Sequence, residues 1–252
     1  MCGRYFLLSP AETLAVLYVL QRTGSLPNWP PSTNVAPTDR MPVVRRNAAG
    51  ARELVLLRWG LVPDWAKDIS IGSRTINARS ESVHEKPSFR AAYRQRRCLV
   101  PADGWYEWIP DGKKSRPVKL EPAAGGVVTF AGLWERWTRP VDVTTGSQRD
   151  QGPKGEVVET FTILTTSASA AIENTHDRMP VILAPDQFNR WLDGPGNDPA
   201  GFEALFQPAP LPVTITPVST AVNSVRNTDL SVLDPVAPPA PRPVQGSLFQ
   251  DS

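Results

Sequence analysis

The residue with the greatest chemical potential is Cys2, which follows the initiator methionine in the opening sequence MCGRY. Aminopeptidases remove an initiator Met that precedes a small residue, so the mature chain would carry a free α-amine and a thiol on Cys2. Their reference pKa values are about 8 and about 8.5, so both groups are partly nucleophilic near neutral pH. Such an aminothiol condenses with an aldehyde to an imine, which the thiol closes to a thiazolidine. The alternative is that Cys2 is only a small residue that begins a strand.

Three further segments combine a polar side chain that can do chemistry with rigid or aromatic neighbours. They are residues 75–81 with Asn77, residues 104–108 with Glu107, and residues 175–180 with His176. Each polar residue also has an ordinary interpretation: Asn77 as a turn residue that satisfies its own backbone, Glu107 as a solvated strand residue, and His176 as a loop residue.

The cysteine and histidine counts limit the chemistry. The chain has two cysteines, Cys2 and Cys98, and two histidines, His84 and His176. This excludes a disulfide framework and favours the reducing cytoplasm. A zinc site would need all four residues, and no two of them have the close spacing that such sites use. We therefore expect neither a metal nor an organic cofactor.

The elements that must position these residues belong to one globular domain. At 252 residues with 40% hydrophobic content, the chain can bury one substantial core. No apolar run is long enough to span a membrane. Residues 11–20 follow no basic segment, so they predict a first helix rather than a secretory signal, with Ser9 as the N-cap and Pro10 in the first position.

Many short strands and few helices predict an α+β fold, with a curved, mostly antiparallel, barrel-like sheet and peripheral helices. A strand through residues 105–108 would place Trp105 and Glu107 on one face. We expect residues 24–42 to form a long irregular loop. Expected strands are 54–59, 98–100, 105–108, 117–120, 127–134, 160–166, 180–183 and 213–218, and further helices are 87–97, 185–192 and 199–206.

The polar sequence of residues 138–158 predicts a mobile hairpin insertion, and the prolines after residue 233 predict a disordered tail over 234–252. The folded domain should therefore cover residues 1–233. Near the end of the tail, Gln245, Leu248 and Phe249 resemble the Gln-x-x-Leu-Phe peptides with which bacterial proteins bind the DNA sliding clamp. The alternative is an unstructured tail without a partner.

Charge is concentrated in one stretch. Between residues 74 and 97, seven basic residues stand against two acidic ones, a local charge of +5 in a chain whose net charge is +2. Such a patch could contact phosphates, although basic helices are often only solvated faces. The basic residues are Arg74, Arg79, Lys86, Arg90, Arg94, Arg96 and Arg97.

Six motifs in this order resemble the SOS-response-associated peptidase (SRAP) family. They cover residues 1–4, 34–37, 58–63, 75–81, 104–108 and 175–180, and the resemblance runs from residue 2 to about residue 220. Proteins of this family protect abasic sites in single-stranded DNA through a covalent DNA–protein crosslink. The resemblance implies that Cys2 forms the crosslink and that Asn77, Glu107 and His176 assist it. It also implies that the peptidase activity is the autocatalytic or assisted removal of Met1.

The residue types suit this chemistry. An abasic deoxyribose is mostly a closed hemiacetal, and a Glu107 carboxyl with a pKa raised by Trp105 and Trp108 could move the proton that opens the ring. His176 could supply the proton for loss of water during imine formation. The side-chain carbonyl of Asn77 could hold the Cys2 amine. Thiazolidine closure would then suppress the β-elimination that breaks the DNA strand.

We expect contacts to single-stranded DNA from Arg4, Arg79 and Arg178 through phosphates, from Asn34, and from Trp59 or Trp65 by base stacking. The protein should be a cytoplasmic monomer that joins the nucleoid when bound to DNA. Two alternatives stay open: an N-terminal-nucleophile amidohydrolase, since glutaminase domains also begin Cys-Gly, and a non-covalent single-strand-binding module.

Overall fold

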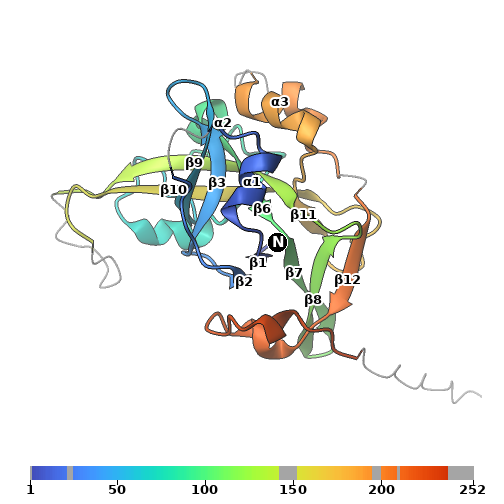
Figure 1. Ribbon diagram of the computed structural model, residues 1–252. Coiled ribbons are helices and arrows are strands. Elements are labelled where there is room, and N and C mark those ends of the chain that lie inside the picture. The colour runs from blue at the N-terminus through green and yellow to red at the C-terminus, as the bar shows by residue number, and fades with distance from the viewer. Residues whose placement is uncertain (1, 22–24, 142–151, 195–199, 209–210, 238–252) are drawn as a thin grey trace, which may run out of the picture.

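Two β-sheets make the body of the protein, and short helices lie around them (Figure 1). The computed structural model describes residues 2–21, 25–141, 152–194, 200–208 and 211–237. The fold is α+β with a barrel-like, mostly antiparallel sheet, which confirms the predicted class.

The first sheet contains a closed ring of five strands. The strands pair in the order β10-β4-β3-β6-β9, and β9 pairs with β10 to close the ring. Within the ring, only the β10–β4 pair is parallel. Closure leaves the ring without a free edge. The ring strands are β3 (Arg40–Arg46), β4 (Arg52–Trp59), β6 (Arg97–Ala102), β9 (Val128–Thr138) and β10 (Val157–Ser167).

Two three-residue strands extend the ring at the C-terminal end of β10. The strand β5 (Asn77–Arg79) runs parallel to β10 with Asn77 opposite Ile163, and β11 (Arg178–Pro180) runs antiparallel with Arg178 opposite Ser167. Residues about a hundred positions apart in the sequence therefore meet at one end of the ring.

The second sheet carries the start of the chain in an interior position. Its order is β12-β8-β7-β1-β2, so β1 (Tyr5–Leu7) lies between β7 (Gly104–Asp111) and β2 (Ser32–Val35). On the far side of β7 follow β8 (Lys114–Pro122) and the edge strand β12 (Val213–Pro217). Tyr5 on β1 packs in the core against Trp59, with ring centroids 5.2 Å apart.

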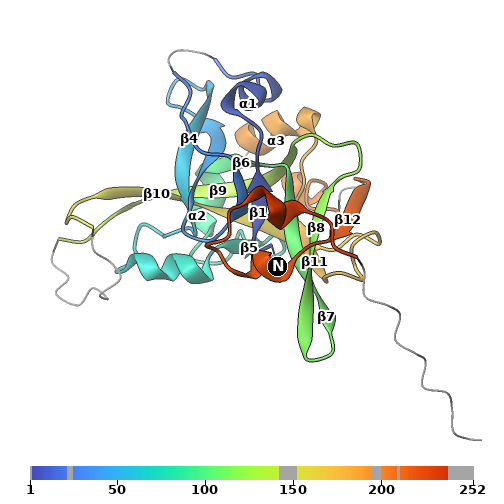
Figure 2. The same ribbon diagram turned by 60° about the horizontal axis from the view of Figure 1, so that its bottom comes forward.

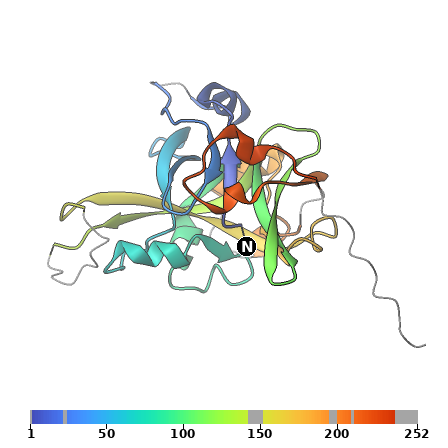
Figure 3. The same ribbon diagram turned by 90° about the horizontal axis from the view of Figure 1, so that it is seen from below.

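The helices are short. The α-helices are α1 (Ala11–Leu17), α2 (Arg90–Gln95), α3 (Phe188–Asp193) and α4 (Ala200–Glu203), and the 3-10 helices are η1 (Ile69–Arg74), η2 (Pro185–Gln187), η3 (Thr220–Asn223) and η4 (Leu230–Leu233). The segment with η3 and η4, drawn in red, crosses over β1 (Figures 2 and 3). Within the described ranges, no helix has the length and apolar character needed to cross a membrane.

Seven of the eight expected strands occur, and the eighth, expected at 180–183, was wrong: only Pro180 of it lies in a strand, at the end of β11, and Ile182 forms a single bridge to Phe130. The prediction of a loop over residues 24–42 was wrong where β2 forms and β3 begins. The sequence of β2 is polar, yet its last three residues are buried by tertiary contacts. The predicted helix cap was also wrong: Pro10 is the N-cap, and Ser9 instead donates to Asp103 through Oγ at 2.6 Å and through its N–H at 2.8 Å.

The predicted segment boundaries shift slightly. The strand β9 ends at Thr138 and β10 begins at Val157, and these two residues pair with each other. Both ends of the expected insertion therefore belong to the β9–β10 hairpin, which projects from the body (Figure 1). Pro235 bridges to Val218, so folded structure passes the expected boundary at residue 233. Residues 142–151 and 238–252, which include Gln245, Leu248 and Phe249, lie outside the described residues.

Candidate active site

Cys2 enters the site through the register of β1. Tyr5 pairs with Trp105, and the Tyr106 N–H donates to the Arg4 carbonyl at 3.0 Å. Continuing this antiparallel register places Gly3 opposite Glu107, one residue from Cys2. The Cys2 side chain is fully buried, and its Sγ lies 3.7 Å from the Arg4 carbonyl oxygen.

Asn77 holds the backbone of Cys2 from the other sheet. Its Nδ2 donates to the Cys2 carbonyl at 2.8 Å. Its Oδ1 is buried and has no hydrogen-bond partner among the described residues. Because a buried unpaired acceptor is costly, this oxygen is a ready partner for an N–H donor. The amide thus contacts Cys2 through its nitrogen, while the carbonyl expected to hold the amine remains available.

Glu107 is buried with 2% of its surface exposed. Burial raises the pKa of Glu107 to about 7, and the charge of Asp177 contributes in the same direction. This agrees in direction with the expectation from the aromatic flank, but only Trp105 shares its face. Trp108 points to the opposite side, where its Nε1 donates to Asn223 at 2.8 Å. A carboxyl with a pKa near 7 can both accept and donate a proton at physiological pH.

The Cys2 thiol is held in its neutral form. Burial raises the pKa of the thiol, and the nearby charge of Glu107 raises it further. A thiol with a raised pKa keeps its proton at neutral pH, so the Cys2 sulfur would lose that proton only as it forms a bond in the reaction.

His176 precedes β11 and lies partly open to solvent. Its Nδ1 accepts the Arg178 N–H at 2.9 Å and lies 2.8 Å from Oδ1 of Asp177. Burial lowers the pKa of His176 below its ordinary value. Accepting at Nδ1 assigns the proton of the neutral ring to Nε2, and the Asp177 carboxylate stabilises the ring once it is protonated. Sequence reasoning missed Asp177, whose only signal was its position directly after His176.

A basic groove begins beside Asn77. It has a volume of about 470 Å³ and contains the exposed side chains of Arg74, Arg79 and Lys86. Other members of the predicted basic stretch do not join this groove. Arg97 is buried and donates to the carbonyls of Tyr93, Trp191 and Gly194, and Arg96 pairs with Glu135 at 2.6 Å.

The structure buries the side chains of two residues that were predicted to contact DNA, Trp59 and Asn34. Trp59 is fully buried, stacks on Phe161 and donates from Nε1 to the Ile76 carbonyl at 2.9 Å, so it presents no face to a base. Asn34 is 1% exposed, and its amide binds backbone carbonyls and Arg4. Trp65, in contrast, is 56% exposed and can stack on a base.

The two remaining arginines already have protein partners. Arg178 forms a two-fold ion pair with Glu81, including an Nη2–Oε2 distance of 2.9 Å, and also donates to the Thr165 carbonyl. Arg4 donates to Asn34 at 2.7 Å. A phosphate at either arginine would have to share or replace these contacts.

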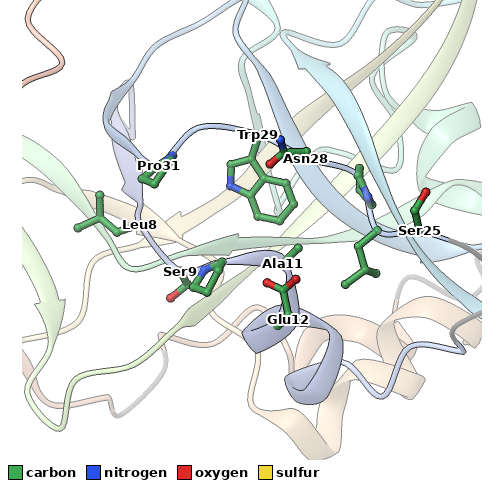
Figure 4. Close-up of a pocket in the computed structure, with 11 residues that line it drawn as sticks. Leu8, Ser9, Ala11, Glu12, Ser25, Asn28, Trp29 and Pro31 are labelled. Atoms are coloured by element: carbon green, nitrogen blue, oxygen red, sulfur yellow. The ribbon is translucent and has the colours of Figure 1, made fainter.

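A second hollow lies beside α1 and has a different character. Leu8, Trp29 and several prolines line this hollow, which has a volume of about 520 Å³ (Figure 4). The candidate site residues do not line it: Cys2, Asn77, Glu107 and His176 all lie elsewhere. Within the described part of the chain, no three His, Cys, Asp or Glu side chains are grouped as metal ligands.

Comparison with known sequences agrees with this geometry. The sequence profile described as "SOS response associated peptidase (SRAP)" matches residues 1–225. The chain belongs to the SRAP family. This SRAP protein is 35% identical over 236 residues to the abasic site processing protein YoqW of Bacillus subtilis (strain 168), an alignment that covers 93% of this chain and 99% of YoqW. It is 31% identical over 271 residues to the abasic site processing protein HMCES of Mus musculus, with 93% of this chain and 76% of HMCES covered.

A solved structure has the same fold. The crystal structure of a Bacteroides thetaiotaomicron protein superimposes on this SRAP protein with a TM-score of 0.77 at 25% sequence identity, covering 94% of this chain and all of the other.

The raised pKa of Glu107 predicts a pH-dependent stability. A carboxyl with a higher pKa in the folded state binds its proton more tightly when folded, so the free energy of unfolding falls as pH rises from about 4.5 to about 7. At about 1.4 kcal/mol per pKa unit, this SRAP protein should lose about 3 kcal/mol across that window relative to its Glu107→Gln variant. Denaturant unfolding of both proteins between pH 4.5 and 8.5 measures the difference.

The exposed Glu12→Gln variant is the matched control for the change of charge. Unfolding free energies of Glu107→Gln and the unmodified protein that stay parallel across this pH range would contradict the assignment.

Proposed function

We propose that this protein senses abasic sites in single-stranded DNA and binds them covalently through Cys2 after removal of Met1. One observation carries the proposal: the Cys2 carbonyl is held by Asn77 at 2.8 Å in a site where Glu107 has a pKa of about 7. The similarity to proteins named for abasic site processing supports the choice of substrate.

The first step opens the sugar. Glu107 moves a proton between the C1 hydroxyl and the ring oxygen of the closed hemiacetal, which breaks the C1–O bond and produces the aldehyde. A pKa near 7 suits this step because the same carboxyl must give and take a proton.

The second step joins protein and DNA. The Cys2 amine adds to the aldehyde carbon, and the carbinolamine loses one water to give the imine. His176 takes a proton from the attacking amine and supplies it to the departing hydroxyl; its lowered pKa makes the protonated ring a stronger acid, and the ring is neutral again once the proton has left. The buried carbonyl oxygen of Asn77, which has no partner among the described residues, accepts a hydrogen bond from the amine during the attack.

The third step makes the link durable. The Cys2 sulfur adds to the imine carbon, the C=N bond becomes a single bond, and the thiol proton passes to the nitrogen. The product is a thiazolidine with the same mass as the imine. Because the imine is consumed, β-elimination from it is suppressed and the DNA strand stays intact.

Removal of Met1 is the peptidase step in this proposal. Until the Met1–Cys2 bond is hydrolysed, the Cys2 nitrogen is an amide and cannot attack an aldehyde. The removal is autocatalytic or assisted, and its product is the aminothiol that the second and third steps use.

The DNA strand would follow the groove beside Asn77. Arg74, Arg79 and Lys86 meet its phosphates, and Trp65 stacks on a base, which contributes roughly 1–3 kcal/mol without selecting a sequence. Binding should weaken as salt rises, because phosphate contacts release counterions. The protein acts as a monomer in the cytoplasm and joins the nucleoid through this contact.

The Cys2→Ser variant separates imine formation from ring closure. It keeps the α-amine but cannot form a thiazolidine, so we expect crosslinks of lower yield and shorter lifetime on an oligonucleotide with one abasic site. Denaturing gel electrophoresis after a chase with competitor measures both. Equal yield and lifetime for Cys2→Ser and the unmodified protein would exclude the thiazolidine step.

We also propose that Gln245, Leu248 and Phe249 bind the bacterial sliding clamp, with the proline-rich sequence before them as a tether. The paired Leu248→Ala and Phe249→Ala substitutions should abolish clamp binding in surface plasmon resonance while leaving abasic-site crosslinking unchanged. Clamp binding by the doubly substituted chain at the unmodified level would dismiss this partner.

A further inference from the structure

The C-terminal part of the fold lies over β1, the strand that begins three residues after Cys2. Residues 219–235, called the latch here, contain η3 and η4 and are closed at their base by the bridge between Val218 and Pro235. The latch crosses β1 in two views of the molecule (Figures 2 and 3). Val222 and Val232 of the latch pack against Phe6 on β1 and Tyr106 on β7.

A single buried side chain ties the latch to the second sheet. The Nδ2 of Asn34 on β2 donates to the carbonyls of Ser224 at 3.0 Å, Asn227 at 2.9 Å and Val222 at 3.3 Å. The other end of the Asn34 amide, Oδ1, accepts from Arg4 Nη1 at 2.7 Å. The Asn34 amide therefore binds the latch through its nitrogen and Arg4 through its oxygen.

Arg4 connects this network to Cys2. Its Nη1 also donates to the Val222 carbonyl at 3.1 Å, and its own carbonyl accepts the Tyr106 N–H. Only Gly3 separates Arg4 from Cys2. Chain ends fray unless they are tied down, and removal of Met1 would make Cys2 the end of the chain. Asn77 binds the Cys2 carbonyl. Two residues further along the chain, Arg4 is bound by Asn34 and by the Val222 carbonyl of the latch.

We propose that the latch, acting through Asn34 and Arg4, is a positioning device that keeps the terminal Cys2 amine and thiol in reach of the abasic aldehyde. The proposal rests on the proposed function. Asn34 and Asn227 are its positioning residues. Asn227 belongs to it because its Nδ2 donates to the Ala221 carbonyl at 2.8 Å, which holds the latch in the shape that Asn34 binds.

The Asn227→Ala variant tests the latch in the full chain. It removes a bond inside the latch and leaves Asn34, Arg4 and the four site residues intact. A displaced nucleophile slows an intramolecular attack steeply, so we expect the crosslinking rate constant at saturating abasic oligonucleotide to fall roughly 10- to 100-fold. The Kd for an oligonucleotide with a tetrahydrofuran site, which has no aldehyde, should stay unchanged.

The Asn47→Ala variant is the matched control. Asn47 also satisfies backbone groups with its side chain, through Oδ1 and the N–H groups of Ala49 and Ala51 in the turn between β3 and β4. It should crosslink at the unmodified rate. If Asn227→Ala does not fold, Asn223→Ala, which removes only the bond to Trp108, should still slow crosslinking.

Hydrogen exchange gives a readout that needs no crosslink. The amides of residues 3–5 should exchange faster in Asn227→Ala than in Asn47→Ala. Unchanged exchange and an unchanged rate constant would overturn the latch, as would a slower reaction explained entirely by weaker DNA binding. Absence of any crosslink with the unmodified protein would instead overturn the proposed function, and the exchange result would still decide the role of the latch.

Discussion

The hydrogen bond from Asn77 Nδ2 to the Cys2 carbonyl is the contact on which the site depends. It joins the second residue of the chain to a strand that extends the barrel, and so unites the two sheets at the point of chemistry. This contact depends on the position of β1 between β2 and β7, because a strand that is hydrogen-bonded on both sides has a fixed position in the sheet. Residues near a chain terminus are ordinarily among the least fixed parts of a protein, whereas here the pairing of β1 on both sides and the bond from Asn77 hold the segment that contains Cys2.

Burial then sets the proton chemistry. Desolvation raises the pKa of Glu107 to about 7 and that of the Cys2 thiol, and it lowers the pKa of His176, so each group favours its neutral form. Groups that favour the neutral form leave no lasting charge in the buried site between proton-transfer steps. The basic side chains stay outside, in the groove beside Asn77, where phosphates would meet them. The buried titratable groups and the exposed basic side chains thus occupy adjacent but separate regions.

The sequence predicted the fold class and the strands that are rich in apolar residues. The alternation of side chains expected in residues 104–108 correctly placed Trp105 and Glu107 on one face of the strand. It failed where burial comes from distant partners. The polar β2 reads as a loop, and Asn34 reads as a surface residue although the latch buries it. Likewise, nothing local distinguishes Trp59, packed between Tyr5 and Phe161, from the exposed Trp65. Propensity and spacing cannot report contacts that arise only when distant segments meet.

Intact mass spectrometry of the protein, mixed with a single-stranded oligonucleotide that bears one abasic site, tests the central claim most directly. The account predicts a denaturation-resistant adduct with the mass of the chain without Met1 plus the DNA minus one water, and peptide mapping should locate it on Cys2. A chain that retains Met1, or one that loses Met1 and forms no adduct, would contradict it.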